Sequence, residues 1–248
     1  MYKGRSMTFI SDTVKFNHAG VKIIAHRGYK SVEIENTLQA FQFSSKTSAY
    51  GIETDVRLTG DGKFIVVHDG DLKRLAGIDG VTVENTSFDA LRQIPLLNKQ
   101  GDFDANYHLP TVEEYIFACK QANKQAILEI KEIDYENSKR LATLVSDLGY
   151  LDKTTFISFS EDSLHAVREV SPNQSVQLLV NDFDIALIPK LVINKWDLDI
   201  KYSALTKERI DALHELNVKV NCFTVNHKDV AELLVFWGVD MITSDNLE

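Results

Sequence analysis

Cysteine, proline and long apolar runs are all scarce in this sequence of 248 residues. Its two cysteines, Cys119 and Cys222, cannot build a disulfide framework and do not lie in a metal-ligand spacing, so we expect a reducing compartment. No stretch approaches the roughly 20 consecutive apolar residues of a membrane-spanning helix, which argues against stable membrane insertion. The first residues, MYKGRSMTFISDTVKF, contain neither an apolar run nor a small-residue cleavage site. We therefore expect no secretory signal and a cytoplasmic location.

The chain also lacks a run of basic residues. It carries 36 acidic and 27 basic residues, which leaves a formal net charge of −9. Without a Lys/Arg-rich segment it is a poor candidate for binding the phosphate backbone of DNA or RNA. A composition of 44% hydrophobic and 25% charged residues is typical of a globular protein and excludes a disordered or collagen-like chain. Nucleic acid is therefore not the expected partner, and the composition leaves the oligomeric state open.

Short apolar, β-branched runs alternate with segments of helical spacing along most of the chain. Eight runs predict strands, at residues 22–28, 51–56, 126–131, 154–160, 175–180, 196–203, 218–226 and 239–245. Helical spacing fills the intervals, near residues 36–49, 111–123, 135–149, 161–170, 183–192, 206–217 and 227–237. This alternation over about 250 residues favours an α/β fold of the (β/α)8, or TIM, barrel type over an open doubly wound sheet.

One interval breaks the alternation after the second predicted strand. Residues 59–63 (TGDGK) form a strong turn signal, and FIVVHD at 64–69 predicts a further strand, so the second strand continues into a hairpin. Residues 70–110 contain no clear barrel element, and a loop this long is usually functional or a small subdomain. We therefore expect residues 1–248 to form a single barrel domain, with an insertion at about 70–110 over one end of the barrel.

Carboxylates concentrate on two of the predicted strands. In GIETDV, Glu53 and Asp55 share one face, and in AILEIK, Glu129 and Lys131 share one face. Two carboxylates on one strand repel each other unless a positive charge lies between them. Three carboxylates without cysteine ligands suit Mg²⁺ or Ca²⁺. The spacing alone leaves open the alternative that these groups form salt bridges inside the barrel.

Two histidines and an arginine also lie at strand ends. His26 ends the first strand in HRG, and His68 lies near the end of the extra strand in VVHD, although a lone histidine at such a position is more often structural. Arg27 is followed by Gly28 and suits either an anion site or an ordinary salt bridge. Together with a cation and Lys131, these groups can clamp a phosphate while two imidazoles divide the proton transfers. The combination indicates phosphodiester chemistry at the C-terminal ends of the barrel strands.

Five motifs in order resemble those of the glycerophosphodiester phosphodiesterase family, over residues 22 to 245. They are AHRGYKSVEIENTLQAF, GIETDVRLTGDGKFIVVHDGDLKRLAG, LPTVEEYI, LEIK, and VKVNCFTVN followed by GVDMITSD. The resemblance implies metal-dependent hydrolysis of a small glycerophosphodiester, such as glycerophosphocholine or glycerophosphoethanolamine, to glycerol 3-phosphate and an alcohol. It also implies one divalent cation, usually Mg²⁺ or Ca²⁺.

The resemblance further assigns roles to individual residues. It implies that His26 and His68 are the acid–base pair. It implies that the metal ligands are Glu53, Asp55 and Glu129 and that the two phosphate contacts are Arg27 and Lys131. The chain departs from the family pattern at Ile34, where a proline is usual, and at Phe223, where a tryptophan is usual. Phe223 is therefore a candidate substrate-binding residue, and filling the barrel is the alternative.

Two other functions use the same residues. The first is a phospholipase D-like enzyme acting on lysophospholipids, which requires an apolar entrance. The second is a non-catalytic barrel that binds phosphate ligands. Such a barrel would usually have lost one of the seven site residues, and none is missing here. Candidates for an apolar entrance occur in the insertion, although we favour the interpretation that they form its own core: Phe88, Leu91, Ile94, Leu96 and Leu97. We interpret Lys73 and Arg74 as solvated, and we assign no role to Asp245.

Overall fold

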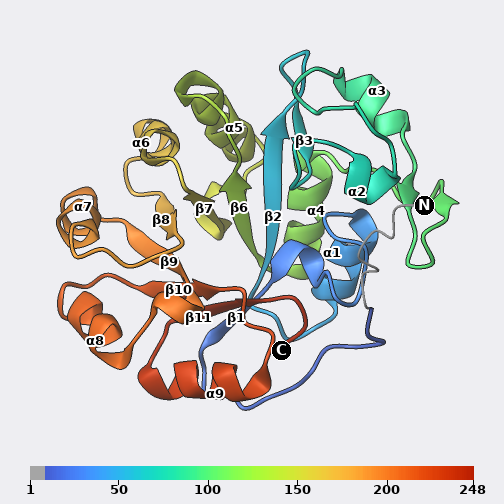
Figure 1. Cartoon of the computed structure of the whole chain (residues 1–248). Coiled ribbons are helices and arrows are strands. Elements are labelled where there is room, and N and C mark those ends of the chain that lie inside the picture. Colours follow the sequence, from blue (N-terminus) through green and yellow to red (C-terminus); the bar gives the residue numbers. More distant parts are fainter. Residues whose placement is uncertain (1–8) are drawn as a thin grey trace.

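The computed structural model describes residues 9–248, whose strands close into a barrel surrounded by helices (Figure 1). The sheet order is β1-β11-β10-β9-β8-β7-β6-β2, and β1 also pairs with β2, so the parallel sheet has no open edge. This arrangement confirms the predicted (β/α)8 barrel. Its strands are β1 (Lys22–Ala25), β2 (Gly51–Leu58), β6 (Gln125–Ile130), β7 (Thr154–Ser158), β8 (Ser175–Val180), β9 (Asp197–Lys201), β10 (Val220–Phe223) and β11 (Met241–Ser244).

Helices connect the successive barrel strands, as the spacing predicts. They are α1 (Leu38–Ser45), α4 (Val112–Ala122), α5 (Tyr135–Asp147), α6 (Glu161–Val170), α7 (Leu187–Asn194), α8 (Lys207–Glu215) and α9 (Lys228–Trp237). Short 3-10 helices at His26–Gly28 and Tyr202–Ala204 take up the ends of two predicted strands, and a third, at Leu151–Lys153, lies between a predicted helix and a predicted strand. Within the described residues, no helix is both long and apolar enough to cross a membrane. The prediction about a secretory signal concerns residues 1–16, of which residues 1–8 lie outside the described residues.

Side-chain caps explain where several helices begin. Thr37 caps α1 by accepting a hydrogen bond from the Ala40 N–H, and Thr111 forms a reciprocal capping box with Glu114 on α4. Thr37 also donates to the carbonyl of Ile34, which is fully buried. The departure from the family pattern at Ile34 therefore leaves the start of α1 capped.

The insertion after β2 has its own small core. Strand β3 (Phe64–Val66) pairs antiparallel with β2, which confirms the predicted hairpin, and the chain then forms α2 (Lys73–Ala76), α3 (Phe88–Gln93), β4 (Leu96–Leu97) and β5 (Phe103–Asp104) beside it (Figure 1). Leu91 and Leu96 are fully buried among side chains of this segment and of β3. Their burial supports the interpretation that these residues form a core rather than an apolar entrance. The division of residues 1–248 into one domain with an insertion stays a prediction.

The two faces of the barrel strands separate apolar from polar chemistry. Ile52 and Val56 of β2 pack outward against the helices. Ile127 of β6 belongs to a separate apolar cluster inside the barrel, and Glu129 follows two residues later on the same face. The interior is therefore apolar at the level of Ile127 and acidic one step nearer to the C-terminal end, where barrel active sites lie.

Asp199 of β9 is an acid inside the barrel that the sequence did not single out. Its neighbours Leu198 and Ile200 pack outward, so its side chain faces the interior, where it is 1% exposed and its Oδ1 has no hydrogen-bond partner among the described residues. Burial, and secondarily the charge of Glu129, raises the pKa of Asp199 well above its usual value. Burial therefore favours the protonated form of this carboxyl group.

We expect Asp199→Asn to become progressively more stable than the wild type as the pH rises from 5 to 8. In the unfolded chain Asp199 loses its proton near pH 4, whereas its raised pKa in the folded protein moves this loss to higher pH. Between the two pKa values the folded state binds more protons, so the wild type loses stability with rising pH. Between the unfolded and the folded pKa, the free energy of unfolding of the wild type falls by about 1.4 kcal/mol for each pH unit. Urea unfolding of both proteins at several pH values measures the difference, and a difference that does not change with pH would contradict the prediction.

Candidate active site

The C-terminal end of the barrel brings together the residues that the sequence singled out. Glu53 and Asp55 come from β2, Glu129 from β6, and one carboxylate oxygen of each lies within 4.8 Å of the others. All three are buried, and Asp55 Oδ1 has no hydrogen-bond partner among the described residues. Buried carboxylate oxygens at this spacing are a donor set that Mg²⁺ or Ca²⁺ accepts. The residues present therefore fit a hard divalent cation.

Positive side chains flank this acidic cluster. Lys131 Nζ lies 2.8 Å from Glu129 Oε1 and 3.6 Å from Asp55 Oδ1, and Arg27 Nε lies 3.2 Å from Asp55 Oδ2. The buried Asn36 side chain donates to Asp55 Oδ2 at 2.8 Å and thereby fixes the carboxylate. Sequence reasoning noted Asn36 within the first motif but gave it no role.

The three carboxyl groups respond differently to burial. Burial and then the charge of Asp55 raise the pKa of Glu53 well above its usual value, and the same two causes raise the pKa of Glu129 to about 7. Burial alone would raise the pKa of Asp55 as well, but the positive charges led by Arg27 outweigh it and lower that pKa. Asp55 therefore remains ionised, burial favours the protonated form of Glu53, and Glu129 titrates near pH 7 unless a cation neutralises the cluster.

Backbone geometry sets the position of Arg27. The residue lies in the left-handed region at φ 50°, its backbone N–H donates to Glu53 Oε2 at 2.8 Å, and its Nη1 donates to Glu35 Oε1 at 2.8 Å. Gly28 follows at φ 76°, and a Cβ there would lie 2.8 Å from the backbone carbon of Ala40. Only glycine permits this approach of the HRG turn to α1. The turn thereby holds both the backbone and the side chain of Arg27 against carboxylates of the site.

His26 is held by an aspartate that directly follows β11, the last strand of the barrel. Its Nδ1 donates to Asp245 Oδ1 at 2.5 Å, and Asp245 Oδ2 accepts from Asn226 at 2.7 Å. The Nε2 atom of His26 lies 3.9 Å from Glu53 Oε2. Burial and the charge of Arg27 lower the pKa of His26, so the imidazole is neutral at pH 7 with its proton on Nδ1. Asp245, to which we assigned no role, is therefore a partner of the site.

His68 has a similar arrangement. Its Nδ1 donates to Asp69 Oδ1 at 2.7 Å, and Asp69 Oδ2 accepts from Arg74 Nε at 2.7 Å. We interpreted Arg74 as solvated; its side chain is 38% exposed, but its two Nη atoms also donate to the two oxygens of Glu35 at 2.7 and 2.8 Å. The buried carboxylate of Glu35 requires such donors, and α2 supplies one across the mouth of the barrel. Lys73, by contrast, is 62% exposed and pairs with Asp79.

A polar cavity of about 380 Å³ opens at this end of the barrel. It is lined by Arg27, Lys30, Ser31, Glu35, His68, Asp69 and Arg74. The lining contains three basic side chains, two carboxylates, a serine and a histidine, and no aliphatic residue, phenylalanine, tyrosine or tryptophan. This chemistry suits a small, hydroxylated phosphate ester rather than an acyl chain.

Comparison with known proteins supports this chemistry. A family model described as "Glycerophosphoryl diester phosphodiesterase family" matches residues 26–248. The chain belongs to this family. Its members are phosphoric diester hydrolases, and the chain is an enzyme of that class. The sequence resemblance and the enzyme class that we expected are thereby confirmed.

Individual relatives match over most of their length. A glycerophosphodiester phosphodiesterase of Bacillus altitudinis is 28% identical over 240 residues, which cover 90% of this chain and 94% of the relative. A solved glycerophosphodiester phosphodiesterase of Parabacteroides distasonis is 27% identical, with a TM-score of 0.76 and coverage of 94% of each chain. An Oleispira antarctica phosphodiesterase, solved in complex with sn-glycerol-3-phosphate, has a TM-score of 0.81 at 24% identity, and covers 94% of this chain and 96% of its own. The last comparison concerns the fold alone.

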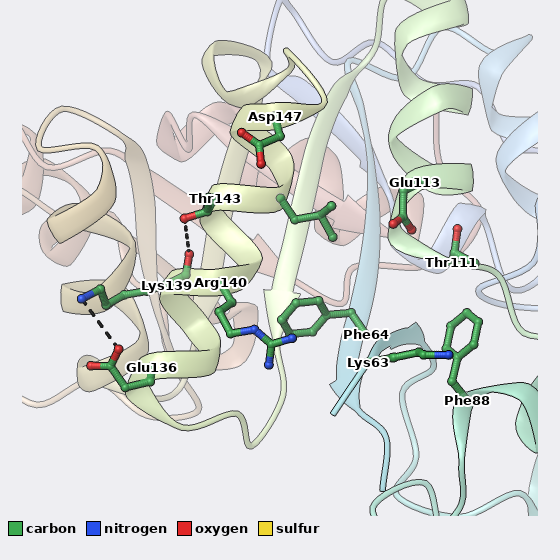
Figure 2. Close-up of a pocket in the computed structure, with 11 residues that line it drawn as sticks. Lys63, Phe64, Phe88, Thr111, Glu113, Glu136, Lys139, Arg140, Thr143 and Asp147 are labelled. Atoms are coloured by element: carbon green, nitrogen blue, oxygen red, sulfur yellow. Dashed lines mark hydrogen bonds and ion pairs between the residues drawn. The ribbon is translucent and has the colours of Figure 1, made fainter. Parts of the chain in front are cut away.

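A larger groove of about 740 Å³ lies away from this candidate active site, among the β2–β3 hairpin, α3, α4 and α5 (Figure 2). Phe64 lines it beneath the guanidinium of Arg140, and Phe88 lines it beneath the ammonium of Lys63. None of the site residues predicted from the sequence lines this groove. Its size therefore does not make it the active site.

Phe223 lies at the end of β10 above the apolar cluster inside the barrel. It packs against that cluster while remaining partly exposed, and its ring centre lies 6.4 Å from that of Phe159 in a T-shaped contact. The packing supports the interpretation that Phe223 closes the barrel interior. Its role in substrate binding, where the family usually has tryptophan, stays a prediction.

Proposed function

We propose that this enzyme hydrolyses small glycerophosphodiesters to glycerol 3-phosphate and an alcohol, with His26 and His68 as its acid–base pair. The observation that carries the proposal is the arrangement of the two imidazoles at the mouth of the barrel. Each donates a hydrogen bond from Nδ1–H to an aspartate, so each keeps Nε2 for proton transfer. The imidazole that acts as the base takes up, at its free Nε2, the proton of the hydroxyl group that attacks phosphorus. The imidazole that acts as the acid enters as the imidazolium, with a second proton on Nε2, and gives that proton to the leaving alkoxide. The attacking hydroxyl group is that of water, or that of the neighbouring glycerol carbon, in which case water then opens the cyclic phosphate.

The other site residues divide between charge and position. Glu53, Asp55 and Glu129 would hold one divalent cation, Mg²⁺ or Ca²⁺, which supplies Lewis-acid stabilisation of the phosphoryl oxygens when it is bound. Arg27 and Lys131 lie beside these carboxylates and place further positive charge where the phosphate becomes more negative in the transition state. The roles of these residues rest on their positions and on the family motifs that they occupy.

The lining of the cavity bears on the choice between substrates. A lysophospholipid would bring a long apolar chain to the mouth of the barrel, whereas the cavity beside His68 is lined by polar side chains alone. Leu91 and Leu96 of the insertion are fully buried and provide no apolar surface. These observations favour a deacylated diester over a lysophospholipid as substrate.

Release of glycerol 3-phosphate from glycerophosphocholine and glycerophosphoethanolamine tests the proposed function. We expect turnover with Mg²⁺ or Ca²⁺, loss of turnover with EDTA, and little activity on the corresponding lysophospholipids. Turnover of lysophospholipids alone would overturn the substrate assignment. Full activity in EDTA would overturn the role of the cation, and absence of cation binding would remove the metal site. The preferred cation and alcohol follow from the same assay.

We also propose that the enzyme acts in the cytoplasm on this small-molecule substrate, without a nucleic-acid partner. The proposal rests on the scarcity of cysteine and on the absence of a basic run in the sequence. Cell fractionation with an antibody against the chain tests it, and recovery in an extracytoplasmic fraction would contradict it.

A further inference from the structure

We propose that Arg74 is a positioning residue that fixes the tautomer of His68 and the orientation of Arg27 at the same time. The proposal rests on the roles proposed above for His68 and Arg27. It gives the insertion a function in the reaction, because α2 carries Arg74 to the mouth of the barrel.

Every nitrogen of the Arg74 guanidinium already has a carboxylate partner. Nε donates to Asp69 Oδ2 at 2.7 Å, Nη1 donates to Glu35 Oε2 at 2.7 Å, and Nη2 donates to Glu35 Oε1 at 2.8 Å. A guanidinium engaged in this way has little capacity left to bind a phosphate directly. The geometry points instead to a bridge between the two carboxylates that hold His68 and Arg27.

On one side, Arg74 acts through Asp69. An ionised carboxylate only accepts hydrogen bonds, so Asp69 Oδ1 requires the proton of His68 on Nδ1 and leaves the Nε2 lone pair open. Asp69 is 27% exposed and lies directly beyond His68, so one hydrogen bond alone would leave its carboxylate able to rotate. Arg74 Nε holds the second oxygen and fixes that rotation.

On the other side, Arg74 acts through Glu35. The Glu35 carboxylate is 2% exposed and accepts from both Arg74 and Arg27. Without Arg74, Arg27 would be the one ion-pair partner left to this buried carboxylate among the described residues. The carboxylate would then draw the Arg27 guanidinium away from Asp55. A lysine at position 74 preserves the charge but cannot donate in the planes of two carboxylates at once.

Steady-state kinetics on the cation-loaded enzyme tests this bridge. We expect Arg74→Ala to lower kcat about 100-fold, as a small misplacement of catalytic groups does, and Arg74→Lys to recover only a minor part of the loss. Exogenous guanidinium is expected to restore part of the activity of Arg74→Ala. The matched control is Arg92→Lys, because Arg92 forms a comparable two-pronged ion pair with Glu114 from the same insertion. We expect this control to lower the melting temperature while leaving kcat within about twofold of the wild type.

The tautomer of His68 provides a readout that does not depend on turnover. ¹⁵N NMR of the wild type is expected to show the proton of His68 on Nδ1. In Asp69→Asn, Arg74 Nε attracts the amide oxygen, so the amide NH₂ faces His68 and moves its proton to Nε2. In Asp69→Asn with Arg74→Ala, that preference is expected to disappear.

Each result either supports or overturns the bridge. A kcat of Arg74→Ala within about twofold of the wild type would overturn it, as would a loss of kcat in Arg92→Lys of the same size, because the effect would then be one of general stability. An unchanged His68 tautomer in Asp69→Asn would overturn the part that acts through Asp69. If the wild type shows no phosphodiesterase activity, the proposed function fails while the NMR experiments still decide the bridge. If Arg74→Ala does not fold, Arg74→Lys and Asp69→Asn carry the test.

Discussion

Replacing His26 with asparagine is expected to lower kcat/KM for glycerophosphodiesters by about 10²–10⁴-fold, the usual contribution of a general acid or base. The substitution removes the Nε2 atom of His26, which is the proton carrier in the proposed mechanism. The asparagine amide can still donate to Asp245 in place of Nδ1, so the closing contact between the first turn and the last strand is retained. The melting temperature is therefore expected to change little.

His214→Asn provides the matched control. His214 also pairs with an aspartate, because its Nε2 lies 2.9 Å from Asp240 Oδ2, but it lies on α8 outside the site. The substitution is expected to leave kcat/KM unchanged. Steady-state assays with both variants at saturating cation separate the two cases. A His26→Asn enzyme with more than about a tenth of wild-type activity would contradict the acid–base role.

Replacing Glu129 with glutamine is expected to weaken cation binding at least about 100-fold, since changes to second-shell partners alone cost 10–100-fold. The variant keeps the size of the side chain but removes one of three clustered carboxylates. The effect of Glu129→Gln on the free energy of unfolding is expected to have opposite signs in the absence and in the presence of the cation. Burial and the charge of Asp55 raise the pKa of Glu129 to about 7, so at pH 8 the ionised group destabilises the cation-free protein and glutamine relieves this.

With saturating Mg²⁺ or Ca²⁺ the order is expected to reverse. A cation at 100 times its Kd stabilises the wild type by about 2.7 kcal/mol, most of which the Glu129→Gln variant loses. Calorimetric titration and melting curves in EDTA and in excess cation measure both effects. Asp199→Asn is the matched control, because Asp199 is also a buried acid inside the barrel but does not belong to the carboxylate cluster. Equal cation affinity in Glu129→Gln and the wild type would remove Glu129 from the metal site.

Local patterns in the sequence determined the elements of the fold and the face on which many site residues lie. The period of two along a strand placed Glu53 with Asp55 and Glu129 with Lys131, while their neighbours Ile52 and Val56 turned outward. Capping residues such as Thr37 marked where helices begin. These features follow from the backbone geometry of a few consecutive residues, so they could be predicted without knowledge of the tertiary structure.

Only the tertiary structure decided which distant residues complete the site. Closure of the barrel pairs β11 with β1, and this contact brings Asp245 to His26 across 219 positions of the chain. Likewise, the path of the insertion decides that Arg74 meets Glu35. The physical reason is that a charged residue in a loop has no periodic pattern, and its partner is set by how the chain returns to the barrel. The sequence by itself therefore determined the barrel and its acidic cluster, and the closed fold determined which distant side chains meet at the site, Asp245 with His26 and Arg74 with Asp69 and Glu35.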